Sequence, residues 1–396
     1  MKILKLIFVF WVVPVVSVFA LTPSNIVDEI TRLSYENFHT NLFVHTNENR
    51  GFNTSVSPCV PANQHDLARD YILSSFTNIG LSAALDPFGF SGYTNCNNVV
   101  AMKPGLNPSN YGYYVIGAHY DSVNSSSCDH AGANDNASGV AGVLEVARVL
   151  SAYTFKATLV FIAFDGEEAG LTGLNGSYHY VADSTTTTNN DPLKIWRTNV
   201  RSMISMDMIA YNYASSNKAA ILGGDSDPFK PVRTNLANAL TQYAGLSFNN
   251  SAANNSSDHG PFYYGGMDAC LLIEYNHGSD PYYHQVGDAV DTAGYIDYEF
   301  AVKMTKGVAG YLCSQAGLVP PASATTVQPE AAGTNFVMTW DSMAGLVQQV
   351  QWRDGLTGAA EWNVFGTYTN TDGAWSLTVT DQVKGVSLRF YRVQSW

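Results

Sequence analysis

Five short segments of this 396-residue chain each place a histidine or a carboxylate where an apolar run ends. The segments are AHYDS, GANDNASG, FDGEEAG, SMDMIA and YYHQVGD, and their candidate metal ligands are His119, Asp135, Glu168, Asp207 and His284. Imidazole nitrogens and carboxylates are the ligands that zinc takes in sites that keep one position open for water. The set therefore predicts a metal site with hydrolytic chemistry.

The number of carboxylates favours two metal ions over one. Two ions roughly 3.5–4 Å apart can share one carboxylate and one hydroxide. Asp135 is the expected bridge, with His119 and Asp207 completing one site and Glu168 and His284 the other. Three carboxylates and a hydroxide would then balance the positive charge of two zinc ions while both imidazoles stay neutral.

Two further carboxylates lie beside the predicted ligands. Glu167 and Glu168 are adjacent, so their side chains should point in different directions in an extended segment. We assign Glu168 to metal and Glu167 to the general base, which takes a proton from water and passes it to the leaving amine. Asp121, two residues after His119, is expected to accept the proton of the second ring nitrogen and so to fix the tautomer.

Each segment has a common alternative when it stands alone. A His-x-Asp is often a surface polar pair, a Glu-Glu pair is often a solvated helix start, and Asp-Asn-Ala-Ser-Gly is typical of a helix cap. The position of Asp135 just before a predicted helix also suits a ligand, because the helix N-terminus stabilises a carboxylate. The order and combination of the segments favour the metal site.

In this order the segments resemble those of secreted zinc aminopeptidases of the bacterial leucyl-aminopeptidase type, whose wider group includes glutamate carboxypeptidases and glutaminyl cyclases. The resemblance covers about residues 25–315. It implies an α/β fold, the zinc exopeptidase fold, in which helices sandwich a mixed central sheet. It also implies two Zn²⁺ ions held by the five ligands, Glu167 as the base, and peptide or protein N-termini as substrates.

This sequence differs from the family pattern at the group that stabilises the oxyanion. Some members place a tyrosine a few residues before the Ser-Asp-His segment, whereas Asn254 and Asn255 precede Ser257 here. Tyr275 and Tyr283 are the substitutes that the sequence offers, and the alternative is that both only pack beside a buried strand.

Two other functions stay open. A glutaminyl-peptide cyclotransferase fits because HYDS and FDGEEA also resemble that branch, although cyclases work with one zinc and usually carry tryptophan where Tyr283 stands. A non-catalytic ectodomain on the same fold is the third interpretation, and the presence of all five ligands and the base argues against it. The leading hypothesis is a metallo-aminopeptidase that hydrolyses the N-terminal peptide bond.

Residues 1–20 predict a signal peptide, since Lys2 and Lys5 precede an apolar run that ends in small residues before Leu21. A signal anchor is the alternative. We expect a secreted or periplasmic protein, free of the membrane once the signal is removed.

Without this segment 18 basic side chains remain against 33 acidic ones, a net charge of −15. Nucleic acid and anionic membranes are poor partners for such a surface.

Apolar runs alternate with helical patterns along residues 21–317. The runs predict strands covered on both faces, and they lie at 113–118, 157–164, 203–206 and 270–273. The helical patterns lie at 25–39, 65–79 and 138–150. This alternation indicates an α/β domain, in which ligands bind beyond the carboxyl ends of the strands. Cys270 begins one of these runs, so we expect it in the core.

The composition changes after Gly317. A Pro-containing stretch over 318–327 indicates a linker, and alternating apolar residues over 328–396 predict a β-sandwich-like module that resembles fibronectin-type or carbohydrate-binding appendages. Its tryptophans either pack in a core or bind a ligand, so the module could bind a polymer or a cell surface. We expect the whole chain to be a monomer.

Overall fold

The computed structural model divides the chain into two compact units, Thr22–Val319 in one and Pro320–Trp396 with Met1–Leu21 in the other. The residues that it describes are 22–46, 50, 64–90, 93–123, 131–169, 173–183, 195, 197–250, 252–319, 327–329, 335–341, 347–353, 363–369, 376–382 and 390–395. The predicted signal peptide therefore lies outside the described residues.

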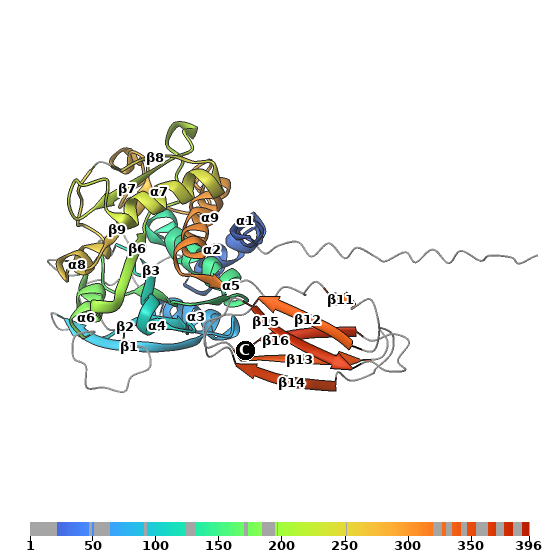
Figure 1. Cartoon of the computed structure of the whole chain (residues 1–396). Helices are drawn as coiled ribbons and strands as arrows, with labels where there is room; N and C mark the ends of the chain where they lie inside the picture. Colours follow the sequence, from blue (N-terminus) through green and yellow to red (C-terminus); the bar gives the residue numbers. More distant parts are fainter. Residues whose placement is uncertain are drawn as a thin grey trace, which may run out of the picture. The chain divides into compact units, whose positions relative to one another are not determined.

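The Thr22–Val319 unit is built on a mixed eight-stranded sheet with the order β1-β2-β5-β3-β6-β9-β7-β8 (Figure 1). The strands are β1 (Ser82–Phe90), β2 (Tyr93–Lys103), β3 (Tyr113–His119), β5 (Thr158–Phe164), β6 (Val200–Met206), β7 (Lys218–Gly223), β8 (Ser247–Asn249) and β9 (Ala269–Glu274). Strands β5, β3, β6 and β9 are parallel neighbours, and the strands that flank them run antiparallel. The carboxyl ends of four strands therefore share one edge.

The central strands are buried on both faces, as their continuous apolar runs predict. Every residue of β5 and β9 is buried, and so are the last five of β3. Cys270, expected in the core, is fully buried in β9. The four predicted strands and the α/β class are thus confirmed.

Helices cover both faces of the sheet (Figure 1). Helices α6 and α8 pack on one face, where Tyr180 and Phe262 join a buried cluster with strand residues such as Val115 and Val160. Helices α3, α5 and α7 cover the other face, and α9 packs on α5 and α7. None of the helices within the described residues is long and apolar enough to cross a bilayer. The bounds are α1 (Pro23–Val27), α2 (Arg32–Thr46), α3 (Gln64–Asn78), α4 (Pro108–Tyr111), α5 (Gly139–Ser151), α6 (Asn175–Asp183), α7 (Pro231–Ala244), α8 (His259–Tyr264) and α9 (Tyr298–Gln315).

Helix α5, predicted over 138–150, lies at Gly139–Ser151 and is buried on nearly every side. The sequence predicts one apolar face, but contacts with the sheet, α2 and α9 enclose the rest of the helix. Its first residue approaches β6 closely, because a Cβ on Gly139 would lie 2.1 Å from the Met206 carbonyl oxygen. This contact brings the start of α5 next to the end of β6.

The helix predicted over 25–39 is two helices, α1 and α2. The break is set by Thr31 and Ser34, whose hydroxyls each accept a hydrogen bond from the other's backbone N–H at 3.2 Å. This reciprocal pair starts a new helix in the way that a capping box does. Apolar periodicity continues across the break, which is why the sequence pattern predicts one helix.

The α/β unit extends past Gly317. Leu318 and Val319, which we assigned to the linker, form β10 (Leu318–Val319) and pair with β4 (Thr154–Phe155). Beyond the unit, the C-terminal strands form two three-stranded antiparallel sheets, with the orders β11-β12-β15 and β14-β13-β16. They are β11 (Val327–Pro329), β12 (Asn335–Asp341), β13 (Val347–Arg353), β14 (Asn363–Thr369), β15 (Ser376–Gln382) and β16 (Phe390–Ser395).

We predict that a chain ending at Val319 unfolds at a higher temperature than one ending at Gly317. The shorter chain loses the β10–β4 pairing and the burial of Val319, which is 6% exposed. Burial of such a side chain contributes about 1.5–3 kcal/mol. Thermal melts of both chains, followed by circular dichroism, measure the difference, and equal midpoints would contradict a stabilising role for β10.

Candidate metal centre

All five predicted ligands lie at the edge where the parallel strands end. His119 is the last residue of β3, Asp207 directly follows β6, and Glu168 lies four residues past β5. Asp135 lies in the irregular turn Ala133–Ser138 that precedes α5, and His284 lies in the loop between β9 and α9. Segments distant in sequence thus meet at one place.

Asp135 lies between two histidines, with one oxygen facing each. Its Oδ1 is 3.2 Å from His119 Nε2, and its Oδ2 is 3.2 Å from His284 Nε2. Asp207 Oδ1 lies 3.5 Å from His119 Nε2, and Glu168 Oε1 lies 2.9 Å from His284 Nε2. Donor atoms lie within 4.8 Å of one another in three groups of the described residues. One is His119–Glu167–Glu168, and the other two share Asp135 and form the triads His119–Asp135–Asp207 and Asp135–Glu168–His284. One shared carboxylate therefore joins the two triads.

The environment of Asp207 fits a bound cation. Its Oδ2 accepts a hydrogen bond of 2.8 Å from Ser257 Oγ, whereas its Oδ1 is buried and makes no hydrogen bond to the described residues. Oδ1 thus has only the ion-pair contact with His119 Nε2 at 3.5 Å, and a buried carboxylate oxygen without a hydrogen bond is costly unless an ion satisfies it. Together with two imidazoles and two further carboxylates, this donor set suits zinc.

The histidines and carboxylates shift one another's pKa. Burial lowers the pKa of His284, but its hydrogen bonds to Asp135 and Glu168 outweigh this and raise it to about 10. Burial raises the pKa of Glu168 to about 7, and the charge of Asp135 adds to this effect. Burial opposes protonation of His119, yet the charge of Asp207 helps to raise its pKa well above the usual value. Protons thus neutralise the metal-free site at pH 7.

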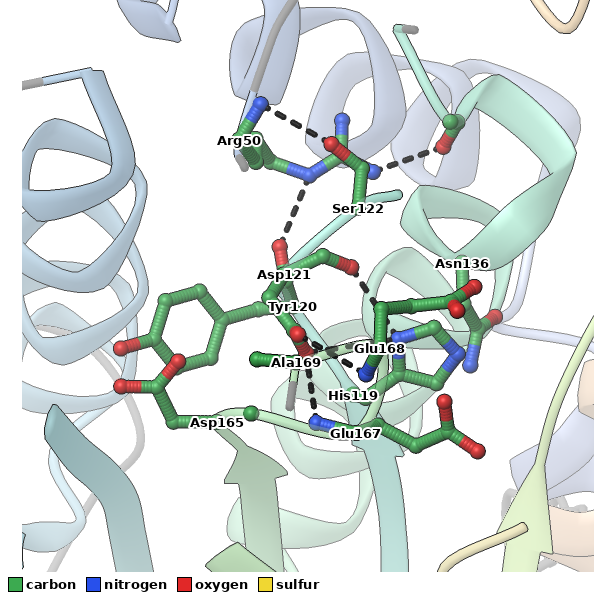
Figure 2. Close-up of polar contacts among 12 residues, drawn as sticks. Arg50, His119, Tyr120, Asp121, Ser122, Asn136, Asp165, Glu167, Glu168 and Ala169 are labelled. Atoms are coloured by element: carbon green, nitrogen blue, oxygen red, sulfur yellow. Dashed lines mark hydrogen bonds and ion pairs between the residues drawn. The ribbon is translucent and has the colours of Figure 1, made fainter. Parts of the chain in front are cut away.

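Asp121 lies behind the site, fully buried, and its bonds differ from the expected ones. Its two carboxylate oxygens accept hydrogen bonds from the backbone N–H groups of Glu167 and Glu168, at 3.1 and 3.0 Å (Figure 2). The second ring nitrogen of His119 contacts the backbone oxygen of Asp121 at 3.0 Å, while the carboxylate is 3.6 Å away. Asp121 thus orients His119 through its backbone oxygen, because its carboxylate accepts hydrogen bonds from the Glu167–Glu168 turn.

Glu167 and Glu168 approach His119 from the same turn. Figure 2 shows both carboxylates on the side toward which the His119 imidazole points. A carboxylate oxygen of each lies within 4.8 Å of a ring nitrogen of His119. Burial raises the pKa of Glu167 well above its usual value, and the neighbouring charge of Glu168 contributes while His119 opposes it. A raised pKa makes a carboxylate a stronger base, which suits the predicted role of Glu167 as the general base.

Asp288 holds the Asp135 turn and was missed in the sequence. Its Oδ1 and Oδ2 accept hydrogen bonds from the backbone N–H groups of Asn134 and Asp135, at 2.6 and 3.0 Å. It lies four residues after His284, so it links the loops of two predicted ligands. The sequence does contain a signal for Asp288, because this residue ends the YYHQVGD segment that carries the predicted ligand His284.

The Ser-Asp-His segment lies beside the site without adding a predicted ligand. Ser257 bonds Asp207, and Asp258 is fully buried with neither carboxylate oxygen hydrogen-bonded to the described residues. Burial raises the pKa of Asp258 to about 7. A ring nitrogen of the buried His259 contacts the Asn254 carbonyl at 2.6 Å.

The two tyrosines considered for the oxyanion lie in different surroundings. The ring of Tyr283 stacks on His284, with centroids 3.9 Å apart. Burial raises the pKa of Tyr283, and the negative charges of Asp135 and Glu168 add to this. Tyr275 instead has the Lys218 ammonium 3.9 Å above its ring centroid. The geometry therefore favours Tyr283.

We predict that zinc binding at pH 7 releases at least two protons for a fully loaded site. His119, His284 and part of the Glu168 population are protonated below their raised pKa values and must give up these protons to bind metal. Release should therefore decline as the pH rises through about 7 and then about 10. Titration calorimetry in buffers of different ionisation enthalpy measures it. Proton-neutral binding at pH 7 would contradict a protonated metal-free site.

Comparison with known proteins finds a matching family and several relatives. Residues 98–312, more than half of the chain, match the family model described as Peptidase family M28. A probable zinc metalloprotease of Pyrenophora tritici-repentis is 29% identical over 299 residues, which cover 64% of this chain and 64% of that protein. An aminopeptidase of Bacillus subtilis is 30% identical over 198 residues, which cover 49% of this chain and 40% of that protein. The chain thus matches less than two thirds of either relative's length.

Solved structures share the fold. The LapA aminopeptidase of Legionella pneumophila superposes with a TM-score of 0.61 at 20% identity, covering 74% of each chain. A glutaminyl cyclase of Macrostomum lignano superposes with a TM-score of 0.60 at 20% identity, covering 78% of this chain and 95% of that one. At these identities the likeness concerns the fold alone. With its matched sequence, this sheet and the two triads at its edge, the chain belongs to peptidase family M28.

Proposed function

We propose that the chain is an exported zinc aminopeptidase that removes N-terminal residues from peptides with two zinc ions. The observation that carries the proposal is Asp135, whose two oxygens face two separate ligand triads. A single ion would need only one triad. The names of the related aminopeptidase and zinc metalloprotease support the reaction class.

The residues around the triads have distinct roles in this proposal. Zinc held by the triads would polarise the scissile carbonyl and lower the pKa of a bound water. Glu167 accepts the proton of the attacking water and returns it to the leaving nitrogen. Asp121 keeps Glu167 and Glu168 in place through their backbone N–H groups. The Tyr283 phenol donates a hydrogen bond to the carbonyl oxygen as negative charge develops on it.

Export is part of the proposal and rests on residues 1–20, with their two lysines, apolar run and small residues before Leu21. The C-terminal module is expected to bind a polymer or a surface and to take no part in the chemistry. Its support is that every proposed catalytic residue lies within the Thr22–Val319 unit.

A glutaminyl cyclase is the second candidate, because a solved cyclase shares this fold. The two enzymes make different demands on the site. The cyclase reaction releases ammonia from an N-terminal glutamine and needs no attacking water, whereas the peptidase needs both water and a base. The shared position of Asp135 between two triads favours the peptidase.

The free N-terminal amine tests the reaction directly. The crowded carboxylates of the site favour a cationic or metal-binding amine over an acylated nitrogen. We therefore predict that an aminoacyl p-nitroanilide is cleaved, that its N-acetylated counterpart is not, and that a chelator abolishes cleavage until zinc is restored. Equal cleavage of both substrates would reject the aminopeptidase. Ammonia release from N-terminal glutamine, without peptide cleavage, would favour the cyclase.

Glu167→Gln and Glu168→Gln separate the base from the ligand. The amide at 167 keeps the shape but removes the base, so we predict two bound zinc ions and about 10²–10⁴-fold lower kcat. Glu168 lies 2.9 Å from His284 Nε2 in the second triad, so its amide should lose zinc first. Metal content by mass spectrometry and kcat are measured on both proteins. The opposite pattern would exchange the two roles.

Tyr283→Phe tests the oxyanion donor. The phenylalanine can keep the stacking on His284 but has no hydroxyl to donate. Loss of one such donor costs about 10²–10³-fold in kcat, and we expect KM and zinc content to change little. Tyr275→Phe is the matched control and should be nearly neutral, because Tyr275 lies against Lys218. A larger loss in the control would move the role to Tyr275.

A further inference from the structure

A buried arginine lies behind the metal centre and belongs to none of the sequence motifs. Arg50 is fully buried, and its guanidinium donates hydrogen bonds to three backbone carbonyls. Its Nε bonds the Tyr120 oxygen at 2.9 Å, Nη1 the Ala131 oxygen at 2.6 Å and Nη2 the Gly132 oxygen at 2.7 Å. Its own N–H donates to Ser122 Oγ at 3.1 Å. Figure 2 shows Arg50 above the His119–Ser122 segment.

The three carbonyls belong to two different ligand segments. Tyr120 directly follows His119 at the end of β3, and Ala131 and Gly132 directly precede the turn that carries Asp135. His119 and Asp135 must approach one ion together, and their nearest side-chain atoms are 3.2 Å apart. Besides this contact between the His119 and Asp135 side chains, the Arg50 guanidinium links the backbones of the two segments.

The link requires the shape of a guanidinium. Arginine presents five donors in a planar fork, whereas a lysine ammonium is a point charge with three donors. Packing around it is tight, because Gly132 has φ of +61° and a Cβ there would lie 2.8 Å from Arg50 Nη2. Burial lowers the pKa of Arg50 to about 10, and the charges of Asp288, Asp121 and Asp135 act against this. The group therefore stays cationic at neutral pH among carboxylates that repel one another.

We propose that Arg50 is a positioning residue of the metal centre, whose guanidinium fixes the separation of the His119 and Asp135 segments so that both side chains can hold the same ion. The inference rests on the proposed function only in that the site binds zinc. It assigns Arg50 no contact with substrate. Its loss should weaken zinc binding first at the triad that contains both His119 and Asp135.

The chain offers a matched control in Arg233. This side chain is 1% exposed, and it also donates to backbone carbonyls, those of Asp225 and Asp227 at 2.9 and 3.0 Å. Arg233 lies on α7, near the carboxyl end of β7. Because β7 runs antiparallel to β9, this end of β7 is at the opposite edge of the sheet from the predicted ligands. Arg233→Lys thus removes a similar buried fork without touching a ligand segment.

The experiment compares full-length wild type, Arg50→Lys and Arg233→Lys. Zinc affinity is measured by competition with a chromophoric chelator, the Co²⁺-loaded absorption spectrum reports ligand geometry, and thermal melts report stability. Both variants should melt at lower temperature. Only Arg50→Lys should lose zinc affinity, by about 10–100-fold, as expected for residues that orient ligands, and change the Co²⁺ spectrum.

Two results would overturn the proposal. One is a zinc affinity of Arg50→Lys equal to wild type, and the other is an equal loss in Arg233→Lys, which would attribute the effect to lower stability. If Arg50→Lys does not fold, Arg50→Gln takes its place, because a neutral amide with two N–H donors cannot bond all three carbonyls. There an unchanged zinc affinity overturns the proposal. A protein that binds zinc but cleaves no aminoacyl substrate would reject the proposed function and leave this test intact.

Discussion

Carboxylates repel one another, and this chain gathers them at one edge of its sheet. Asp135, Glu168 and Asp207 lie among the predicted ligands, with Glu167 and Asp121 beside them. Their charge raises the pKa values of both histidines in the predicted ligand set, so protons offset the negative charge of the site when no metal is bound. Divalent cations can take the place of those protons, and the surrounding structure must hold the carboxylates together in either state.

Three buried charged side chains meet this demand by bonding to backbone groups of the segments that carry the predicted ligands. Asp121 holds the Glu167–Glu168 turn through two N–H groups, and Asp288 holds the Asp135 turn in the same way. Arg50 acts on carbonyls of the His119 and Asp135 segments. Bonds of this kind fix the backbone position of each predicted ligand and leave its side-chain donor atoms available to an ion.

The sheet beneath supplies the rigidity that such a site requires. Four parallel strands end at the same edge, and their largely apolar residues are packed by helices on both faces. Gly139 allows α5 to start against the Met206 carbonyl, which brings Asp135 and Asp207 from separate elements to one imidazole. A buried framework of this kind keeps ligand positions from drifting when protons or metals exchange.

The sequence by itself determined the α/β class, the central strands, helix α5 and the segments that carry the predicted ligands, because apolar runs and residue types are local properties. Sequence patterns did not predict strands β1 and β2, helix α9 or the break between α1 and α2, since these elements depend on pairing and capping. The contacts of Arg50 and Asp288 with the segments of the predicted ligands were decided only in the tertiary structure. Their partners are backbone groups of distant segments, and backbone groups are the same in every residue, so no sequence pattern records such a bond.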